Sequence, residues 1–199
     1  MLRKNILFYF LMICTYIGLP FLILIHIIPF DYKFYALTIG GIFIYILMRI
    51  YDYSNNEMGL TRFLLKKSII DVLPLTVSFL ILGIILYFFG LSQRFDVTEN
   101  LSFFIFYVFI SCPIQEFLYR GALNCVLMNI FSKKWIIIIF CSLFYSYVHI
   151  IYLDVLTLLL TFGIGVVWHL IYLRTKNLSG VIISHIVLGI LTIIIGLIN

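Results

Sequence analysis

The sequence predicts an all-α integral membrane protein, a polytopic bundle of about seven transmembrane helices. Of its 199 residues, 64% are hydrophobic and only 11% are charged. A soluble domain carries about 25% charged residues, so much of the surface of this chain must face lipid. Apolar stretches recur from end to end, each long enough to cross a hydrocarbon core of about 30 Å. We therefore expect residues 1–199 to form a single integral membrane domain.

Seven apolar runs separated by polar breaks give the expected spans. The first run follows Arg3 and Lys4, as the core of a signal peptide would, but it is too long for one and has no small-residue cleavage site. Residues 51–67, between the second and third spans, end in an alternation of apolar and basic side chains that predicts a short amphipathic helix on the inner leaflet. The expected spans are residues 5–30, 33–50, 68–91, 100–130, 135–153, 155–173 and 179–198.

The cations sort to one side of this seven-span arrangement. Only Lys33 and Arg94 fall on the other side, where most of the neighbouring charges are acidic (Asp31, Asp96, Glu99 and Asp154). The positive-inside rule then places the N-terminus in the cytoplasm and the C-terminus outside. The cations on the cytoplasmic side are Arg3, Lys4, Arg49, Arg62, Lys66, Lys67, Lys133, Lys134, Arg174 and Lys176.

Several ionisable residues lie inside the expected spans, where they are costly and usually functional. Glu116 and Arg120 are four residues apart and share one helix face, either as a packing ion pair or as part of a site. His149 follows Tyr145 by four residues in the next span, and His185 lies in the last one. His169 lies beside Trp168 in the sixth span, and His26, isolated in the first span, is expected to be a hydrogen-bonded packing residue or to lie at the outer interface.

Glu116, His149 and His185 could perform two kinds of chemistry. A carboxylate and an imidazole that share a water form a general base, and a second imidazole can donate to an oxyanion. The same three residues could instead bind zinc. If the spans begin at the membrane surface, the two histidines differ in depth by roughly 10 Å. Their convergence therefore requires the last span to begin deeper or the fifth span to tilt.

In this order, the motifs resemble the CAAX protease and bacteriocin-processing family, also called the Abi family, of intramembrane proteases like the type II CAAX prenyl endopeptidases. The resemblance covers roughly residues 100–198, the family-like core of spans four to seven. The matching motifs are Gln115-Glu116-Phe117-Leu118-Tyr119-Arg120-Gly121, Tyr145-Ser146-Tyr147-Val148-His149 and Ser184-His185.

The resemblance implies an intramembrane endopeptidase that hydrolyses a peptide bond near the membrane. His149 would hold or activate the attacking water, His185 would stabilise the oxyanion, and Glu116 and Arg120 would complete the first motif. The implied substrate is a peptide or membrane protein, prenylated or unmodified, and no organic cofactor is implied.

Two positions depart from the family pattern. The family's first motif normally begins with two glutamates, and Gln115 occupies the first of these positions; a neutral amide cannot act as a general base. Gly189 stands where the family has an asparagine four residues after the later histidine, which removes one oxyanion donor. Glu116 points about 100° away from Gln115 on a helix, so it could take over the base role only if the helix rotated. Gln115 could still position a water or a substrate carbonyl.

Three functions remain open from the sequence. The first is the endopeptidase, for which we favour a metal-free water over a zinc ion held by His149, His185 and Glu116. The second is a weakened family member that acts as a membrane binding or bacteriocin self-immunity protein. The third is a small proton-coupled transporter, although the chain shows none of the internal repeats common in transporters.

All three functions share the same expected setting. We expect a multi-pass protein of a bacterial plasma membrane, because the abundance of Ile, Phe, Tyr and Asn is typical of AT-rich bacterial genomes. Lipid surrounds the bundle, and no nucleic acid is expected as a partner. Glu116, His149 and His185 should face one polar cavity that opens to the cytoplasm or to the bilayer.

Overall fold

The computed structural model describes residues 5–96 and 98–198, and within them every regular element is a helix, as the sequence predicts. Arg3 and Lys4 lie outside these described residues. The helical segments are α1 (Ile6–Ile13), η2 (Cys14–Gly18), α2 (Leu19–Leu24), η3 (Phe30–Tyr32), α3 (Lys33–Ile50), α4 (Leu65–Phe88), α5 (Leu101–Phe106), η4 (Tyr107–Ser111), α6 (Cys112–Glu116), η5 (Phe117–Ala122), α7 (Leu123–Ile130), α8 (Lys134–Tyr147), η6 (Val148–Tyr152), α9 (Val155–Thr175) and α10 (Leu178–Ile194).

These segments join into six helices that are long and apolar enough to cross a membrane, and one shorter apolar helix, in the part of the chain that the structure describes. The six are residues 6–24, 30–50, 65–88, 101–130, 134–152 and 155–175, and the seventh is α10. Each coincides with an expected span to within a few residues. The largest difference is in the first span, which ends at Leu24 because residues 25–28 turn back ahead of Pro29. The polytopic helical bundle is thereby confirmed.

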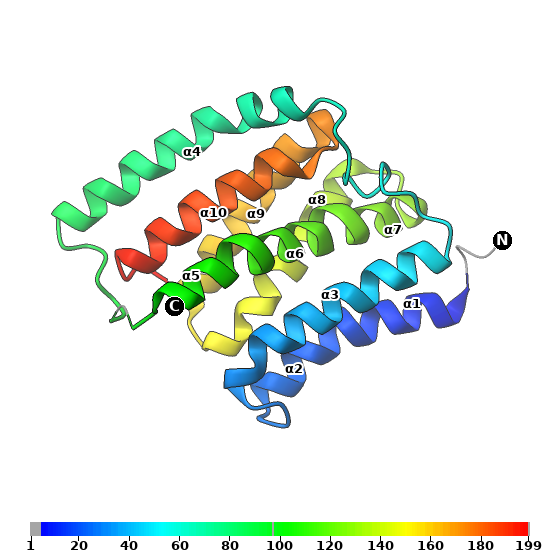
Figure 1. Cartoon of the computed structure of the whole chain (residues 1–199), viewed down its shortest axis with the longest axis horizontal. Coiled ribbons are helices and arrows are strands. Elements are labelled where there is room, and N and C mark those ends of the chain that lie inside the picture. Colours follow the sequence, from blue (N-terminus) through cyan, green and yellow to red (C-terminus); the bar gives the residue numbers. More distant parts are fainter. Residues whose placement is uncertain (1–4, 97, 199) are drawn as a thin grey trace.

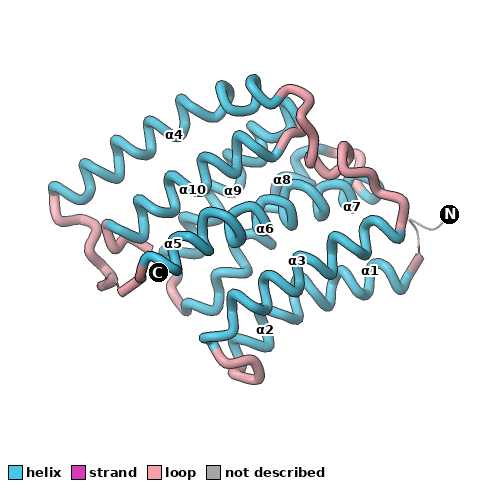
Figure 2. Tube along the Cα trace, in the orientation of Figure 1, coloured by secondary structure: helices cyan, strands magenta, loops and turns pink. Residues whose placement is uncertain are grey.

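The helices lie roughly side by side, with their connections at the two ends of the bundle (Figures 1 and 2). The helix from α5 to α7 crosses the middle of the view, between α10 on one side and α3 on the other (Figure 1). Next to α10, α4 forms one edge, and α1 and α2 lie at the opposite edge beside α3. Behind the central helix, α8 packs along α9. The middle helix, which carries the predicted first motif, is thus enclosed on several sides.

The connection between α3 and α4 forms turns, so the predicted amphipathic helix at its end is wrong. Its side chains are used instead to bind it to the bundle: Met58 is fully buried, and the Tyr53 hydroxyl accepts a hydrogen bond from Asn129 Nδ2 at 2.6 Å. Asn177 Nδ2 donates to the carbonyls of Thr61 and Phe63 at 2.7 and 2.8 Å. The connection therefore covers the start of α10.

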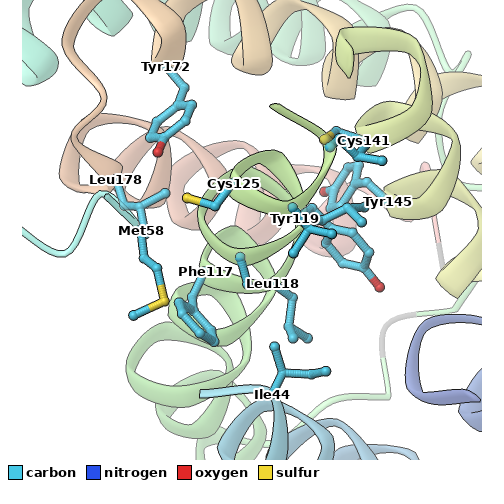
Figure 3. Close-up of a cluster of buried hydrophobic side chains, with 14 of the residues drawn as sticks. Ile44, Met58, Phe117, Leu118, Tyr119, Cys125, Cys141, Tyr145, Tyr172 and Leu178 are labelled. Atoms are coloured by element: carbon cyan, nitrogen blue, oxygen red, sulfur yellow. The ribbon is translucent and has the colours of Figure 1, made fainter. Parts of the chain in front are cut away.

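The middle helix is interrupted by two π-helical segments, η4 and η5, on either side of Cys112–Glu116. π-Helical turns are rare and occur often at functional sites, because they re-aim the side chains that follow them. All six residues of η5, which include Arg120, are buried. Their apolar neighbours form the core of the bundle, and Figure 3 shows Phe117 and Leu118 on this helix near Ile44 and Met58.

Candidate active site

Glu116 and Arg120 form the buried ion pair that their spacing predicts. Arg120 Nη1 lies 3.2 Å from Glu116 Oε1, and the two side chains are 1% and 0% exposed. The guanidinium also donates from Nη2 to the carbonyl of Gly165 on α9 at 3.3 Å, and it lies over the Tyr145 ring of α8, 4.2 Å from the ring centroid. The pair is thereby fixed from three helices, as a buried charge pair requires if it is not to be destabilising.

His185 joins this pair from α10. Its Nδ1 lies 2.7 Å from Glu116 Oε1, a hydrogen bond that orients the imidazole and leaves Nε2 as its outward nitrogen. Nε2 is 3.4 Å from the Tyr145 hydroxyl, and the Trp168 ring stacks on the imidazole at 4.9 Å. Trp168 is itself held by a 2.9 Å hydrogen bond from Nε1 to Ser184 Oγ. His185 therefore has little rotational freedom.

His149 lies one residue into η6, directly after α8. Its Nδ1 is 2.9 Å from the backbone carbonyl of Tyr145. A carbonyl oxygen only accepts hydrogen bonds, so Nδ1 must carry the hydrogen and Nε2 presents a lone pair. The ring centroids of His149 and Tyr145 are 5.3 Å apart, which places Tyr145 between the two histidines. His149 is thus arranged as a base.

Gln115 and Ser111 face the same side of the middle helix. Gln115 Nε2 donates to Ser111 Oγ at 2.9 Å, and the other amide atom, Oε1, is buried without a hydrogen-bond partner among the described residues. Sequence reasoning missed Ser111 and, one turn earlier, Tyr107. The spacing of Tyr107, Ser111 and Gln115 at i, i+4 and i+8 was the signal that could have identified this polar stripe.

Three cavities meet at His149. His185 lines two of them, of about 80 and 160 Å³, and Gln115 lines the 80 Å³ cavity and a third of about 90 Å³. The 80 Å³ cavity, which we call the polar cavity, is the one shared by Gln115, His149 and His185. It has room for at least two water molecules, at about 30 Å³ each. His149 and His185 thus line the same cavity.

Glu116 lines none of these cavities and lies behind His185, with no side-chain exposure. The other two histidines lie elsewhere: His169 Nε2 is 3.1 Å from Asn124 Oδ1 within the bundle, and His26 is exposed in the turn after α2. Glu116 therefore acts on the polar cavity only through His185.

The start of α10 bears on the difference in depth that the sequence predicts between His149 and His185. Leu178 is only 2% exposed, and its N–H donates to the Gly59 carbonyl of the covering connection at 3.2 Å. The last helix thus begins beneath the α3–α4 connection, which agrees with a deeper start of the last span.

The polar cavity lies toward the cation-poor end of the bundle. Its wall includes Lys33, at the start of α3, and Asp96 and Glu99 from the connection between α4 and α5. Because Asp96 and Glu99 are exposed, the cavity reaches the surface at this end.

The site does not fit the zinc arrangement. Over residues 5–96 and 98–198, no group of three His, Cys, Asp or Glu side chains is placed to hold a metal ion. Glu116 Oε1 accepts hydrogen bonds from both His185 Nδ1 and Arg120 Nη1. Glu116 lines none of the three cavities that His149 lines.

Comparison with known proteins gives one family match. Residues 97–191 match the family described as type II CAAX prenyl endopeptidase Rce1-like. This segment contains the middle helix, His149 and His185. No curated protein and no solved structure matches the chain. By its apolar helices the chain is a multi-pass membrane protein, and its residues 97–191 are similar to the type II CAAX prenyl endopeptidase Rce1-like family.

Proposed function

We propose that the protein is an intramembrane endopeptidase that hydrolyses a peptide bond with a water activated by side chains. The observation that carries the proposal is the polar cavity, into which Gln115, His149 and His185 project from three different helical segments. The similarity of residues 97–191 to a peptidase family supports an enzyme that acts on a peptide or protein, and the hydrogen bonds of the individual residues support the roles proposed for them.

His149 is the general base in this proposal. Its Nδ1 hydrogen is held by the Tyr145 carbonyl, so Nε2 takes a proton from the attacking water. Gln115 Oε1, which has no other partner in the described structure, accepts the second hydrogen of that water and orients it. The amide thus keeps a positioning role at a site where it cannot remove a proton.

His185 stabilises the oxyanion. As the water oxygen bonds to the scissile carbonyl carbon, the carbonyl π electrons move onto its oxygen. The imidazolium of His185 donates from Nε2 to that oxygen, while Nδ1 stays bonded to Glu116. When the C–N bond breaks, His149 returns its proton to the leaving nitrogen. Glu116 and Arg120 are positioning residues, because they act through His185 and Tyr145.

From the position of the cavity we also propose the side of the membrane from which the substrate enters the site. The polar cavity reaches the surface beside Lys33, Asp96 and Glu99, at the cation-poor end that the positive-inside rule places outside the cytoplasm. The substrate is therefore a peptide segment at the extracytoplasmic surface of a plasma membrane, bacterial by the compositional argument. From the sequence we expected an opening to the cytoplasm or to the bilayer, and the proposed opening differs from both.

The test compares the termini of membrane and secreted proteins by mass spectrometry. The native cells carry the parent protein, His149→Ala or the control His26→Ala, which removes a histidine outside the site. We expect new termini with the parent and with His26→Ala that disappear with His149→Ala. Identical termini in all three strains, at equal protein levels, would contradict the proposal.

That contrary result would favour a second candidate function, a membrane binding or self-immunity protein. The observation in its favour is that a neutral Gln115 and a bare Gly189 occupy two family positions. Such a protein would retain the Glu116–Arg120–His185 cluster as structure and bind a peptide without cleaving it.

A further inference from the structure

Gly189 is not an empty position in the fold. It lies four residues after His185 on α10, and a Cβ built there would overlap the hydroxyl oxygen of Tyr107. The same Cβ would lie only 2.8 and 3.0 Å from Tyr107 Cζ and Cε1. The end of the Tyr107 side chain therefore occupies the space that any side chain at position 189 would need.

Tyr107 also belongs to the walls of the site. It is the first residue of η4, is 9% exposed, and lines the polar cavity and the 160 Å³ cavity, the two cavities that His149 and His185 share. Its ring meets the His185 imidazole edge to face, with centroids 6.0 Å apart and an interplanar angle of 78°. Its hydroxyl thus lies one helical turn along α10 from the proposed oxyanion donor.

We propose that the Tyr107 hydroxyl is a second oxyanion donor, which replaces the donor missing at Gly189. A phenol O–H is a good donor, and tyrosine is among the side chains that build oxyanion holes. During the reaction Tyr107 donates a hydrogen bond to the developing oxyanion and keeps its proton. The inference rests on the proposed function, because it assigns a further catalytic residue to the same hydrolysis.

The geometry further implies that positions 107 and 189 exclude each other. With the phenol of Tyr107 in its present place, a side chain at 189 would overlap it, so that the phenol would have to move. The two positions therefore form a pair, so exchange of both should restore a donor that exchange of either one removes.

The test measures cleavage by purified protein of a peptide that spans the terminus found in the cellular comparison. We expect Tyr107→Phe to lower kcat by about 10²–10³-fold with KM unchanged, because the donor is used only in the transition state. Tyr172→Phe is the matched control, because Tyr172 is 1% exposed, its hydroxyl is buried without a hydrogen-bond partner among the described residues, and it lines none of the three cavities. It should keep the parent's kcat.

The second arm exchanges the pair. Tyr107→Ala should be as slow as Tyr107→Phe. The double variant Tyr107→Ala with Gly189→Asn should have a kcat at least about tenfold higher than Tyr107→Ala, since one oxyanion donor contributes about 10²–10³-fold to kcat. A Tyr107→Phe rate equal to the parent's, or no gain in the double variant, would overturn the assignment while leaving the proposed function intact. A parent protein that produces no new terminus would overturn both.

Discussion

Arg120 is the buried cation that connects the parts of the site. It contacts Glu116 at 3.2 Å and lies over the ring of Tyr145, 4.2 Å from the centroid. Tyr145 in turn accepts a hydrogen bond from His149 through its carbonyl and faces His185 with its hydroxyl. Arg120 is thus linked to His185 through the Glu116 carboxylate and to His149 through Tyr145.

Replacement of Arg120 by alanine should both destabilise and inactivate the protein. Glu116 would lose its guanidinium partner and keep only the hydrogen bond to His185, and the loss of one partner of a buried ion pair costs about 3–5 kcal/mol of unfolding free energy. The melting temperature of the purified protein in detergent measures this loss.

Two variants make the Arg120 result specific. Lys133→Ala removes an exposed cation from one end of the bundle and should melt close to the parent. Glu116→Gln with Arg120→Met removes both members of the ion pair and should melt above Arg120→Ala, because it also removes the carboxylate that Arg120→Ala leaves without its guanidinium. An Arg120→Ala protein that melts with the parent would show that the ion pair does not support the fold.

At the scale of the elements, the site depends on how closely α10 approaches α4. A Cβ at Gly180 would overlap the backbone carbonyl oxygen of Ser68, and the Gly180 N–H donates to Ser68 Oγ at 3.2 Å. Small residues allow this kind of backbone contact between membrane helices. Because His185 is on the same helix, the contact also sets where that imidazole lies.

Gly180→Ala should therefore lower stability by about 1–3 kcal/mol, the usual cost of overpacking, and reduce cleavage by displacing α10. Gly163→Ala on α9 is the matched control, since a Cβ there meets nothing within 4 Å. It should melt at the parent's temperature or slightly higher, because alanine is a better helix former than glycine. Equal losses in both variants would contradict the close-contact explanation.

Asp154 fixes the element ends near the cavity. It caps α9 by accepting from the Thr157 N–H at 2.9 Å, and it receives two hydrogen bonds from Arg94, at 2.7 and 3.2 Å. Arg94 also donates to the Leu197 carbonyl at 3.1 Å. The guanidinium of Arg94, followed by the Thr157 hydroxyl, holds the pKa of Asp154 well below its ordinary value.

This shift predicts a pH-dependent contribution to stability. A pKa that is lower in the folded state makes the carboxylate stabilising at neutral pH, and the contribution is lost as the pH falls from about 4 through the native pKa. Asp154→Asn should melt below the parent at pH 7, and the gap should shrink as the pH falls below about 4. Ser102→Ala, at an exposed uncharged residue of the same end, should differ from the parent by an amount that does not change with pH. A difference in melting temperature between Asp154→Asn and the parent that stays constant with pH would contradict the stabilising role of the Arg94–Asp154 pair.

The boundaries of the helices could be predicted from the sequence because they follow from local chemistry. Which side chains of different helices contact one another in the site could not be predicted in this way. Residues 100–130 were expected as one span and form one helix from Leu101 to Ile130, since length and apolarity decide this. The hydrogen bond between Glu116 and His185 depends on the rotation and depth of two helices far apart in sequence. The π-helical turns of η4 and η5, which no composition rule signals, help to set that rotation.

For the whole molecule, the site residues gather in one half of the bundle. His149 lies within a few residues of the cation-poor end of its helix, and the polar cavity continues to the exposed Asp96 and Glu99. At the opposite end, the turns between α3 and α4 cover the beginning of α10. The bundle is therefore closed over the site at the cation-rich end and hollow at the other.

Labelling of introduced cysteines can assign each end of the helical bundle to one side of the membrane. Cysteines introduced by Asp96→Cys and Asn56→Cys would lie at exposed positions at the two opposite ends. A membrane-impermeant maleimide added to intact cells should label the first and not the second, because the positive-inside rule puts the cation-poor end outside. The parent protein gives the background from its own four cysteines, three of which are buried. After permeabilisation both variants should label equally. Labelling of Asn56→Cys alone in intact cells would reverse the orientation and move the proposed substrate to the cytoplasmic surface, with the chemistry of the site unchanged.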